Sequence, residues 1–364
     1  MRRAPAVMLI ASAAACLVMA ASRPAAAQWQ IESKDGKASL KFGFLAQPEF
    51  EALETPDTTG TSKNVFLRRL RIMFGGKISD RWTFFVETDS PNLGKGALDA
   101  TGTKDSGNIY IQDAYFTFTY NSYFMVDAGM ILVPLSHNHN QSAATLLPVD
   151  YGPYTFTEST PLGSRVGRDY GGQVRGYPLG HFEYRLGVFQ GVRGPQSTNS
   201  PRFAGRVVWY PFALDNGFFY GGTWQGSKRV VAVGAGFDKQ KEYHSFAFDA
   251  FVEEPLNGGQ QGITAQVNWV RFDGGTFLTT LPKQDALLIE AGVHLFKGRL
   301  TPVAQFSRKT FDNPLLLTQH TWQAGVAWWM KGHQRNIKVT AGRQHTDGLP
   351  DRTQVLAQLQ LFYF

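Results

Sequence analysis

The sequence is nearly free of cysteine. Its 364 residues include one, Cys16, which lies in an N-terminal stretch that we expect to be removed. The rest of the chain then carries no thiol. This excludes disulfides, cysteine nucleophiles and thiolate metal sites.

Long apolar runs and helical periodicity are also scarce. After residue 28 no run of about 18 apolar residues occurs, so no membrane-spanning helix is expected. Apolar residues rarely recur at the spacing of an amphipathic helix. Without Arg2, Arg3 and Arg23 of the N-terminal stretch, the formal net charge falls from +7 to +4, which is too mild to indicate a nucleic-acid partner. Together, these absences point to strands rather than helices.

The N-terminus has the three parts of an export signal. Arg2 and Arg3 form a charged region, Val7–Ala21 is apolar, and Ala25–Ala27 supplies small residues for cleavage. This order predicts a secretory signal peptide over residues 1–27. A twin-arginine signal and a lipoprotein signal fit the same residues less well.

Aromatic residues and alternation are what the sequence has in abundance. Aromatic residues make up 13% of the chain, and 28 residues are Phe. Stretches such as TFFVETD at 83–89 and DAYFTFTY at 113–120 alternate in the manner of a strand with two different faces. The alternation predicts about sixteen strands, at 38–46, 64–78, 82–89, 108–119, 123–132, 166–177, 181–191, 202–210, 230–238, 244–253, 262–272, 286–296, 300–309, 319–330, 335–345 and 354–364.

The connections between these strands alternate in length. Short turns are expected at 79–81, 121–122, 178–180, 297–299 and 331–334. Long polar connections are expected at 47–63, 90–107, 133–165, 273–285 and 310–318. Two connections break the alternation, because 211–229 is long where a turn is expected and 239–243 is short where a loop is expected.

This pattern predicts an all-β fold, an antiparallel transmembrane β-barrel of about sixteen strands over residues 28–364. Outer-membrane barrels have short periplasmic turns and long external loops, and about ten residues of tilted strand span the bilayer. An even strand number places both termini on the periplasmic side. A soluble β-sandwich or propeller would alternate too, but it would not require so aromatic an outward face.

The chain ends in the aromatic stretch QLQLFYF at 358–364. We expect Phe362 and Phe364 to form an assembly signal, through which the last strand engages the barrel-assembly machinery. Gln358 and Gln360 break the apolar series that such a signal favours. A β-bulge near Phe362 would reconcile the two faces of the strand.

Three stretches resemble the phosphate-selective porin O and P family of Gram-negative outer membranes. They are FLRRLRIMFGGKISDRWTFFVETDSPN at 66–92, VGRDYGGQVRG at 166–176 and SKRVVAVGAGFDKQ at 227–240. The resemblance implies a sixteen-stranded barrel, usually a homotrimer in outer-membrane lipid. It also implies passive diffusion of small anions such as phosphate or polyphosphate, without a cofactor.

Two features bear on the anion path that the resemblance implies. Arg68 and Arg69 match the family's arginine pair, which contributes to a basic ladder in the pore. Strand parity places Arg69 and Arg71 in the lumen and Arg68 on the other face near the rim, and we count all three among the residues that line the anion path. The strand before the third loop, YFMVDAGM at 123–130, has Asp127 where phosphate-selective members carry lysines. Phosphate selectivity therefore stays open, with a weakly selective general-diffusion porin as the alternative.

Strand parity assigns two equal sets of charged residues to the lumen. The bases are Lys41, Arg69, Arg71, Lys77, Arg175, Arg185, Arg206 and Lys338. The acids are Glu87, Asp89, Asp113, Asp127, Asp169, Glu183, Asp249 and Glu290. Bases on one wall and acids on the other would create a transverse field. In the alternative interpretation, these charges pair across neighbouring strands.

The connection 133–165 falls where porins fold a loop inward to narrow the pore. The residues expected near the constriction are Asp113, Asp127, Tyr151, Glu158, Arg165, Arg168 and Asp169, with His137, His139 and Asp150 of the same loop as further candidates. Two histidines separated by one residue, with no third ligand in view, do not predict a metal site.

Other classes of barrel fit less well. The sequence has no nucleophile-elbow motif and no cofactor fingerprint, so we expect no enzyme. An energy-coupled transporter would need an N-terminal plug domain, and residues 28–37 are too few. A non-conducting structural barrel remains a further alternative.

Overall fold

The computed structural model describes residues 29–97, 103–155 and 167–364. The predicted signal peptide and two candidate constriction residues, Glu158 and Arg165, lie outside these ranges. In the described part of the chain, no helix is long and apolar enough to cross a membrane.

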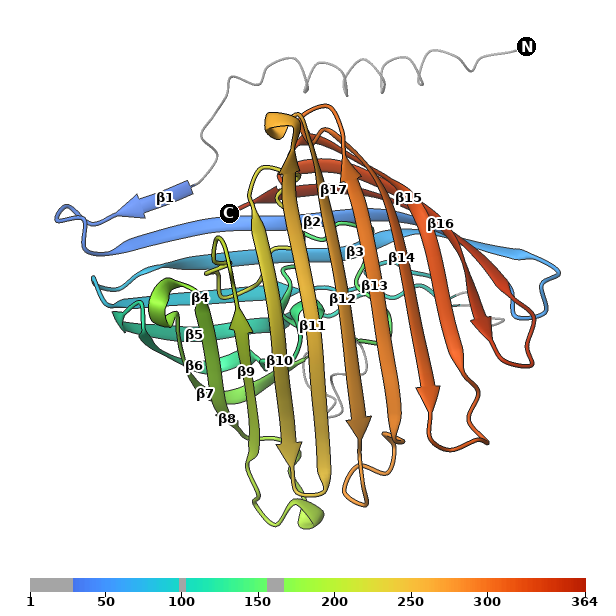
Figure 1. Cartoon of the computed structure of the whole chain (residues 1–364), viewed down its shortest axis with the longest axis horizontal. Helices are drawn as coiled ribbons and strands as arrows, with labels where there is room; N and C mark the ends of the chain where they lie inside the picture. Colours follow the sequence, from blue (N-terminus) through green and yellow to red (C-terminus); the bar gives the residue numbers. More distant parts are fainter. Residues whose placement is uncertain (1–28, 98–102, 156–166) are drawn as a thin grey trace.

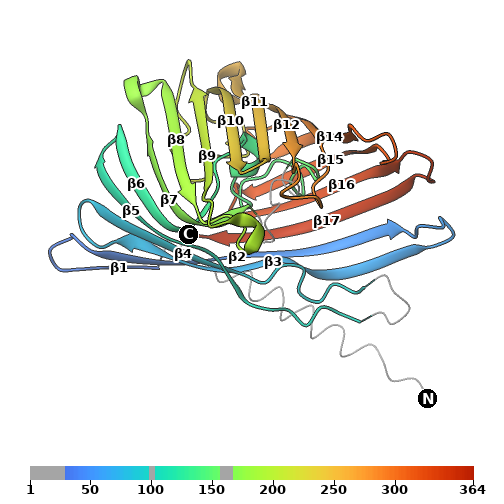
Figure 2. The ribbon, with the colours of Figure 1, turned by 90° about the horizontal axis from the view of Figure 1, so that it is seen from below.

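Sixteen antiparallel strands, β2–β17, form a closed barrel, in which β17 pairs with β2. Figures 1 and 2 show them wrapped around a lumen crossed by coil segments. The strands are β2 Ser39–Glu54, β3 Thr61–Lys77, β4 Trp82–Asp89, β5 Tyr110–Asn121, β6 Phe124–Leu132, β7 Arg168–Gly176, β8 Phe182–Phe189, β9 Arg202–Trp209, β10 Val230–Gln240, β11 Tyr243–Leu256, β12 Gln261–Asp273, β13 Gln284–His294, β14 Leu300–Phe311, β15 Gln319–Lys331, β16 Arg335–Thr346 and β17 Arg352–Tyr363. The predicted fold class and strand number are confirmed.

A few short elements accompany the barrel. Strand β1 (Trp29–Glu32) pairs with the start of β2. The short helices are α2 His137–Asn140, η2 Pro178–Gly180, η3 Pro195–Ser197 and η4 Asn257–Gly259.

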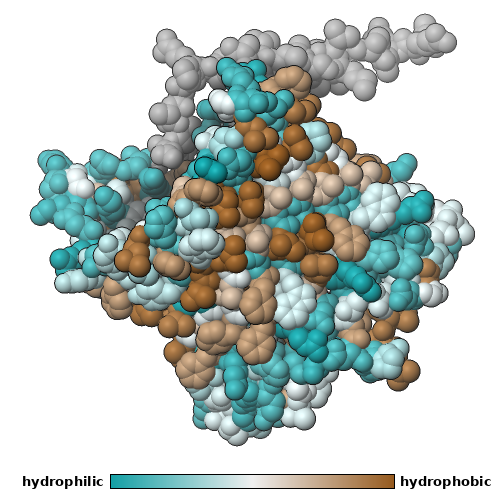
Figure 3. Space-filling model, viewed as in Figure 1, coloured by the Kyte–Doolittle hydropathy of each residue, from teal (hydrophilic) through white to brown (hydrophobic). Residues whose placement is uncertain are grey.

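Alternation separates the lumen from the outer surface. In β13, for example, Glu290 is buried whereas the next residue outward, Ile289, is 47% exposed. Figure 3 shows apolar side chains gathered over the middle of the strands and polar ones over the lower loops. This is the surface that a bilayer requires, because lipid covers the apolar band while water reaches the ends.

The two ends of the barrel differ. At the turn end, where β2 begins and β17 ends, the connections are 78–81, 122–123, 177–181, 210–229, 257–260, 295–299 and 332–334. At the loop end they are 55–60, 90–109, 133–167, 190–201, 241–242, 274–283, 312–318 and 347–351. The predicted loop 47–63 is wrong, because β2 and β3 continue through most of it. Gln47, Glu49 and Glu51 are polar because they face the lumen, where each is buried.

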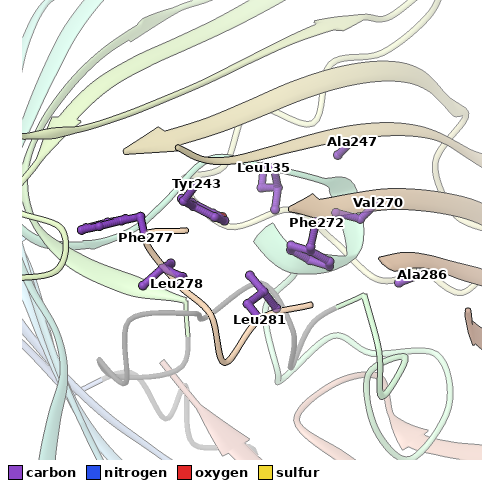
Figure 4. Close-up of a cluster of buried hydrophobic side chains, with 9 residues drawn as sticks. All are labelled: Leu135, Tyr243, Ala247, Val270, Phe272, Phe277, Leu278, Leu281 and Ala286. Carbon is purple, nitrogen blue, oxygen red and sulfur yellow. The ribbon is translucent and has the colours of Figure 1, made fainter. Parts of the chain in front are cut away.

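Three connections fold into the lumen. We call residues 133–155 the inner loop, 210–229 the turn-end insertion and 274–283 the capping loop. Figure 4 shows Phe277 and Leu281 of the capping loop packed beside Tyr243 and Phe272, which face inward from β11 and β12. This apolar cluster fills the loop end of the lumen along β11–β13.

The end of β17 also faces inward. Its pairing with β2 keeps the same register on both sides of a gap at 359–360, so no bulge shifts the strand near Phe362. Gln360, Phe362 and Phe364 therefore share the lumen side. The Phe364 ring lies over Gly75, where an added Cβ would come within 2.9 Å of it. Glycine at this position makes room for the terminal ring.

Candidate pore constriction

A bulge in β3 brings two adjacent arginines to the same side of the sheet. Arg69 pairs with Gln47 and Leu67 pairs with Pro48, which leaves Arg68 as the extra residue. A bulge of this kind lets neighbouring side chains escape strict alternation. Parity counting assumes an unbroken strand and so put Arg68 on the opposite face from Arg69, whereas both side chains reach the same carboxylate of the lumen.

Both arginines bind one carboxylate of the inner loop. Arg68 Nε donates to Asp150 Oδ2 and Arg69 Nη2 donates to Asp150 Oδ1, each at 2.7 Å. Burial alone would raise the pKa of Asp150, but the two arginines outweigh it and hold that pKa well below its usual range. Arg68 keeps 26% of its side chain exposed, whereas Arg69 keeps 4%. The cluster ties the inner loop to β3.

Tyr151 follows Asp150 and lies between two cavities. Its ring centroid is 5.4 Å from the Arg69 guanidinium carbon. Its hydroxyl donates to the carbonyl of Gln141 at 2.8 Å. Tyr151 lines an outer cavity of about 270 Å³ toward the loop end. It belongs to the same apolar cluster as Leu45 and Met73, and these two residues line an inner cavity of about 230 Å³ toward the turn end.

The inner cavity carries charges that are already paired. Arg71 Nη1 donates to Glu87 at 2.7 Å, and its Nη2 lies 3.0 Å from Asp89. Arg168 Nη2 donates to Asp113 at 2.9 Å. These pairs join neighbouring or nearby strands. The arrangement agrees with the alternative interpretation, in which the lumen charges pair with each other instead of forming a basic and an acidic wall.

The turn-end insertion supplies a tip of aromatic residues to the lumen. Phe218 stacks on Tyr115 with centroids 4.3 Å apart. Arg185 holds the tip by donating to the carbonyl oxygen of Phe218 at 2.7 Å. Tyr220 stacks against His137 of the inner loop, with centroids 5.1 Å apart. The insertion and the inner loop thus brace each other inside the barrel.

Most of the remaining predicted lumen residues lie inward and carry bound partners. Arg175 donates to Asp127 at 2.8 Å and Arg206 to Asp249 at 2.5 Å. Lys338 donates to the carbonyls of Leu146 and Pro148 at 2.5 and 3.0 Å. The other such contacts are Arg185–Glu183, Arg202–Asp169 and Gln305–Glu290. At the turn end, Lys41 is half-buried and Lys77 is exposed.

The histidines of the inner loop are packed rather than solvated. His137 lies between Tyr220 and Phe251, with centroid distances of 5.1 and 4.4 Å. Burial lowers the pKa of His137 to about 4 and that of His139 to about 3. Over the described ranges, no three His, Asp or Glu side chains gather in a way that could hold a metal ion.

Some residues of the site were missed by sequence reasoning. Gln47, Glu49 and Glu51 were assigned to a loop, although their alternation with Pro48 and Phe50 continues that of β2. Phe219 belongs to the turn-end insertion, whose unusual length was the available signal.

Comparison with known proteins agrees with this geometry. A family model described as phosphate-selective porin O and P matches residues 41–222, half of the chain. The chain belongs to the phosphate-selective porin O and P family. It is therefore an outer-membrane porin, a channel without enzymatic activity, and the resemblance noted in the sequence is confirmed.

Solved structures support the fold of this porin. The anion-selective porin of Comamonas acidovorans is 10% identical with a TM-score of 0.62, covering 90% of this chain and all of that one. OmpF of Salmonella typhi is 14% identical with a TM-score of 0.59, covering 91% and 100%. The channel DcaP of Acinetobacter baumannii is 10% identical with a TM-score of 0.58, covering 92% and 99%. The search of curated proteins returned no match.

Proposed function

We propose that this porin passes small anions by passive diffusion beside Tyr151. One observation supports the proposal most directly: Arg68 and Arg69 both bind Asp150, and this cluster lies between the two cavities. Within this bonded cluster, positive charge exceeds negative charge by one. A low-dielectric wall focuses such a charge on a passing ion, so anions are favoured.

Phosphate or polyphosphate is one solute to consider, because the family is described as phosphate-selective. The lysines of the phosphate-selective members are absent from β6. Asp127 of that strand is buried and bound to Arg175, Thr117 and Gln173. We therefore expect phosphate to pass as one small anion among several, without a tight site.

A weakly selective general-diffusion porin is the second candidate. Arg71 binds two carboxylates, Glu87 and Asp89. In this group negative charge exceeds positive charge by one, the opposite of the cluster at Asp150. Glu49 also faces the lumen from β2, where it accepts a hydrogen bond from Gln358 at 2.7 Å. These acids would reduce an anion preference or cancel it.

We further propose the cellular setting that the sequence predicts. The chain is exported through residues 1–27 to the outer membrane of a Gram-negative bacterium, with the turn end in the periplasm. The C-terminal strand, with Phe362 and Phe364, engages the barrel-assembly machinery. A homotrimer is expected from the family resemblance, and one OmpT structure from Vibrio cholerae with this fold is described as a trimer form.

The test is the zero-current potential across a planar bilayer in a KCl gradient, followed by titration with phosphate. The protein is refolded without its predicted signal peptide. A potential that indicates chloride preference supports the anion porin, and saturable block by phosphate would add a phosphate site. Little preference supports the second candidate. A correctly folded barrel without conductance contradicts both.

A further inference from the structure

The inner cavity is more apolar than a simple ion requires. Nine of its fourteen lining residues are apolar or aromatic, namely Leu45, Met73, Phe85, Tyr115, Ala143, Ala144, Phe219, Phe362 and Phe364. A bare inorganic ion gains nothing from such a surface, because it must replace its water with polar groups on every side. A solute with an apolar body would use this lining.

Phe85 is the centre of the aromatic part. Its ring centroid lies 5.7 Å from that of Tyr115, 6.1 Å from that of Phe219 and 5.5 Å from that of Phe364. The four rings come from β4, β5, the turn-end insertion and the residue that follows β17. Distances of this size allow edge and offset contacts with a further ring.

Two buried donors belong to the same lining. Arg71 Nε and Gln141 Nε2 have no hydrogen-bond partner among the described residues. Arg71 uses its two terminal nitrogens for Glu87 and Asp89, while the side-chain oxygen of Gln141 accepts from Asn138 at 2.9 Å. An unpaired buried donor is costly, so it marks a place where a ligand oxygen can bind.

We propose that the inner cavity binds a small aromatic carboxylate of about the size of benzoate during its passage through the pore. Its volume is about 230 Å³, and a cavity of about 150 Å³ is enough for benzene. The carboxylate accepts from Arg71 and Gln141, and the ring contacts Phe85 and Phe219. This inference rests on the proposed anion channel and names a solute class for it.

The test compares sodium benzoate with acetate and phosphate at equal concentration. Each is added to the turn-end side of single channels in planar bilayers. Benzoate is expected to reduce the current in a concentration-dependent way, and acetate, which lacks the ring, is not. Equal effects of benzoate and acetate would overturn the proposal.

Phe219→Leu is the informative variant, because Phe219 lies on the turn-end insertion and not in the barrel wall. Loss of one aromatic contact is expected to weaken benzoate block about three- to tenfold. Phe212→Leu is the matched control, since Phe212 lies on the same insertion but does not line the cavity. Equal weakening in both variants would count against the site.

A binding measurement separates this inference from the proposed function. Saturation-transfer NMR of benzoate with the refolded protein in detergent does not depend on conductance. Binding that Phe219→Leu weakens, in a barrel without anion preference, would keep the site and refute the anion porin. An anion-selective channel in which neither NMR nor current detects benzoate would refute the site alone.

Discussion

Arg68 and Arg69 are adjacent in β3, yet both donate to Asp150 at 2.7 Å. Adjacent residues of a regular strand point to opposite faces. The bulge at Arg68 removes that constraint and concentrates two guanidinium groups on one carboxylate. The electrostatics of the proposed channel depend on this local irregularity.

Replacing Arg68 is expected to lower the anion preference. In Arg68→Gln the cluster becomes neutral, so the zero-current potential in a KCl gradient should move toward zero. Glu49→Gln should move it the other way, because it removes a lumen carboxylate. Arg308→Gln serves as the control, since Arg308 is exposed on the outward face of β14. A shift of the same size in the control would contradict the assignment.

Shortening the turn-end insertion is expected to widen the pore. Its tip contacts Tyr115 and Arg185 inside the lumen. Replacing residues 214–226 by a short Gly-Ser linker should raise the single-channel conductance and shorten benzoate block. Removing residues 56–59 from a loop-end connection is the control, and its conductance should match that of the unchanged protein. An unchanged conductance in the first variant would show that the insertion does not restrict the path.

Acidification is expected to loosen the inner loop. Burial lowers the pKa of His137 to about 4, against about 6.5 in the unfolded chain. A depressed histidine pKa stabilises the fold fully above pH 6.5, and that contribution is lost as pH falls toward 4. At pH 5 the stability that neutral His137 contributes is reduced by about 2 kcal/mol. The rate of amide hydrogen exchange in residues 133–155, compared between pH 7 and pH 5, measures this reduction.

His137→Phe isolates that effect. A phenyl ring retains the stacking on Tyr220 and Phe251 but cannot take up a proton. His137→Phe should therefore show a smaller increase in exchange between pH 7 and pH 5 than the unchanged protein. Protonation of Asp215 stabilises the fold on acidification, because burial raises the pKa of that carboxyl to about 6, and this contribution is the same in both proteins. An identical increase would exclude His137 as the cause.

Gly75→Ala is expected to destabilise the barrel. The added methyl group would lie 2.9 Å from the Phe364 ring and 3.3 Å from the Phe84 carbonyl oxygen. Such overpacking costs about 1–3 kcal/mol. Urea titration followed by gel mobility of the unheated protein measures the change. Gly60→Ala is the matched control, because the atom nearest to its added methyl group would be 3.7 Å away. This variant should leave the urea midpoint of unfolding unchanged.

Most of the barrel could be predicted from the sequence because a lipid-facing strand must alternate. Ile289 and Glu290 carry opposite preferences, and the structure places them on opposite faces. The end of β2 was missed for the same physical reason. Lumen-facing residues such as Gln47 and Glu49 are as polar as a loop, so polarity alone does not mark where a strand stops.

The candidate site was less predictable because it depends on contacts between distant segments. Parity put Arg69 and Arg71 on the inner face, where both are buried, and Arg68 on the other face, since a bulge leaves no mark in a simple parity count. Asp150 was named as a candidate of the constriction loop, but its partners are 81 and 82 positions away. Nothing in the local sequence of Phe219 indicates which wall it reaches.

The position of the Phe364 ring links solute recognition to the order of folding. β17 meets β2 at the seam that turns an open sheet into a closed barrel, and the terminal ring comes to lie over Gly75 beside Phe85. An intermediate with an open seam therefore lacks one side of the inner cavity. Such an intermediate cannot retain a ligand there. Retention of the ligand would therefore report that β17 has paired with β2 and closed the barrel.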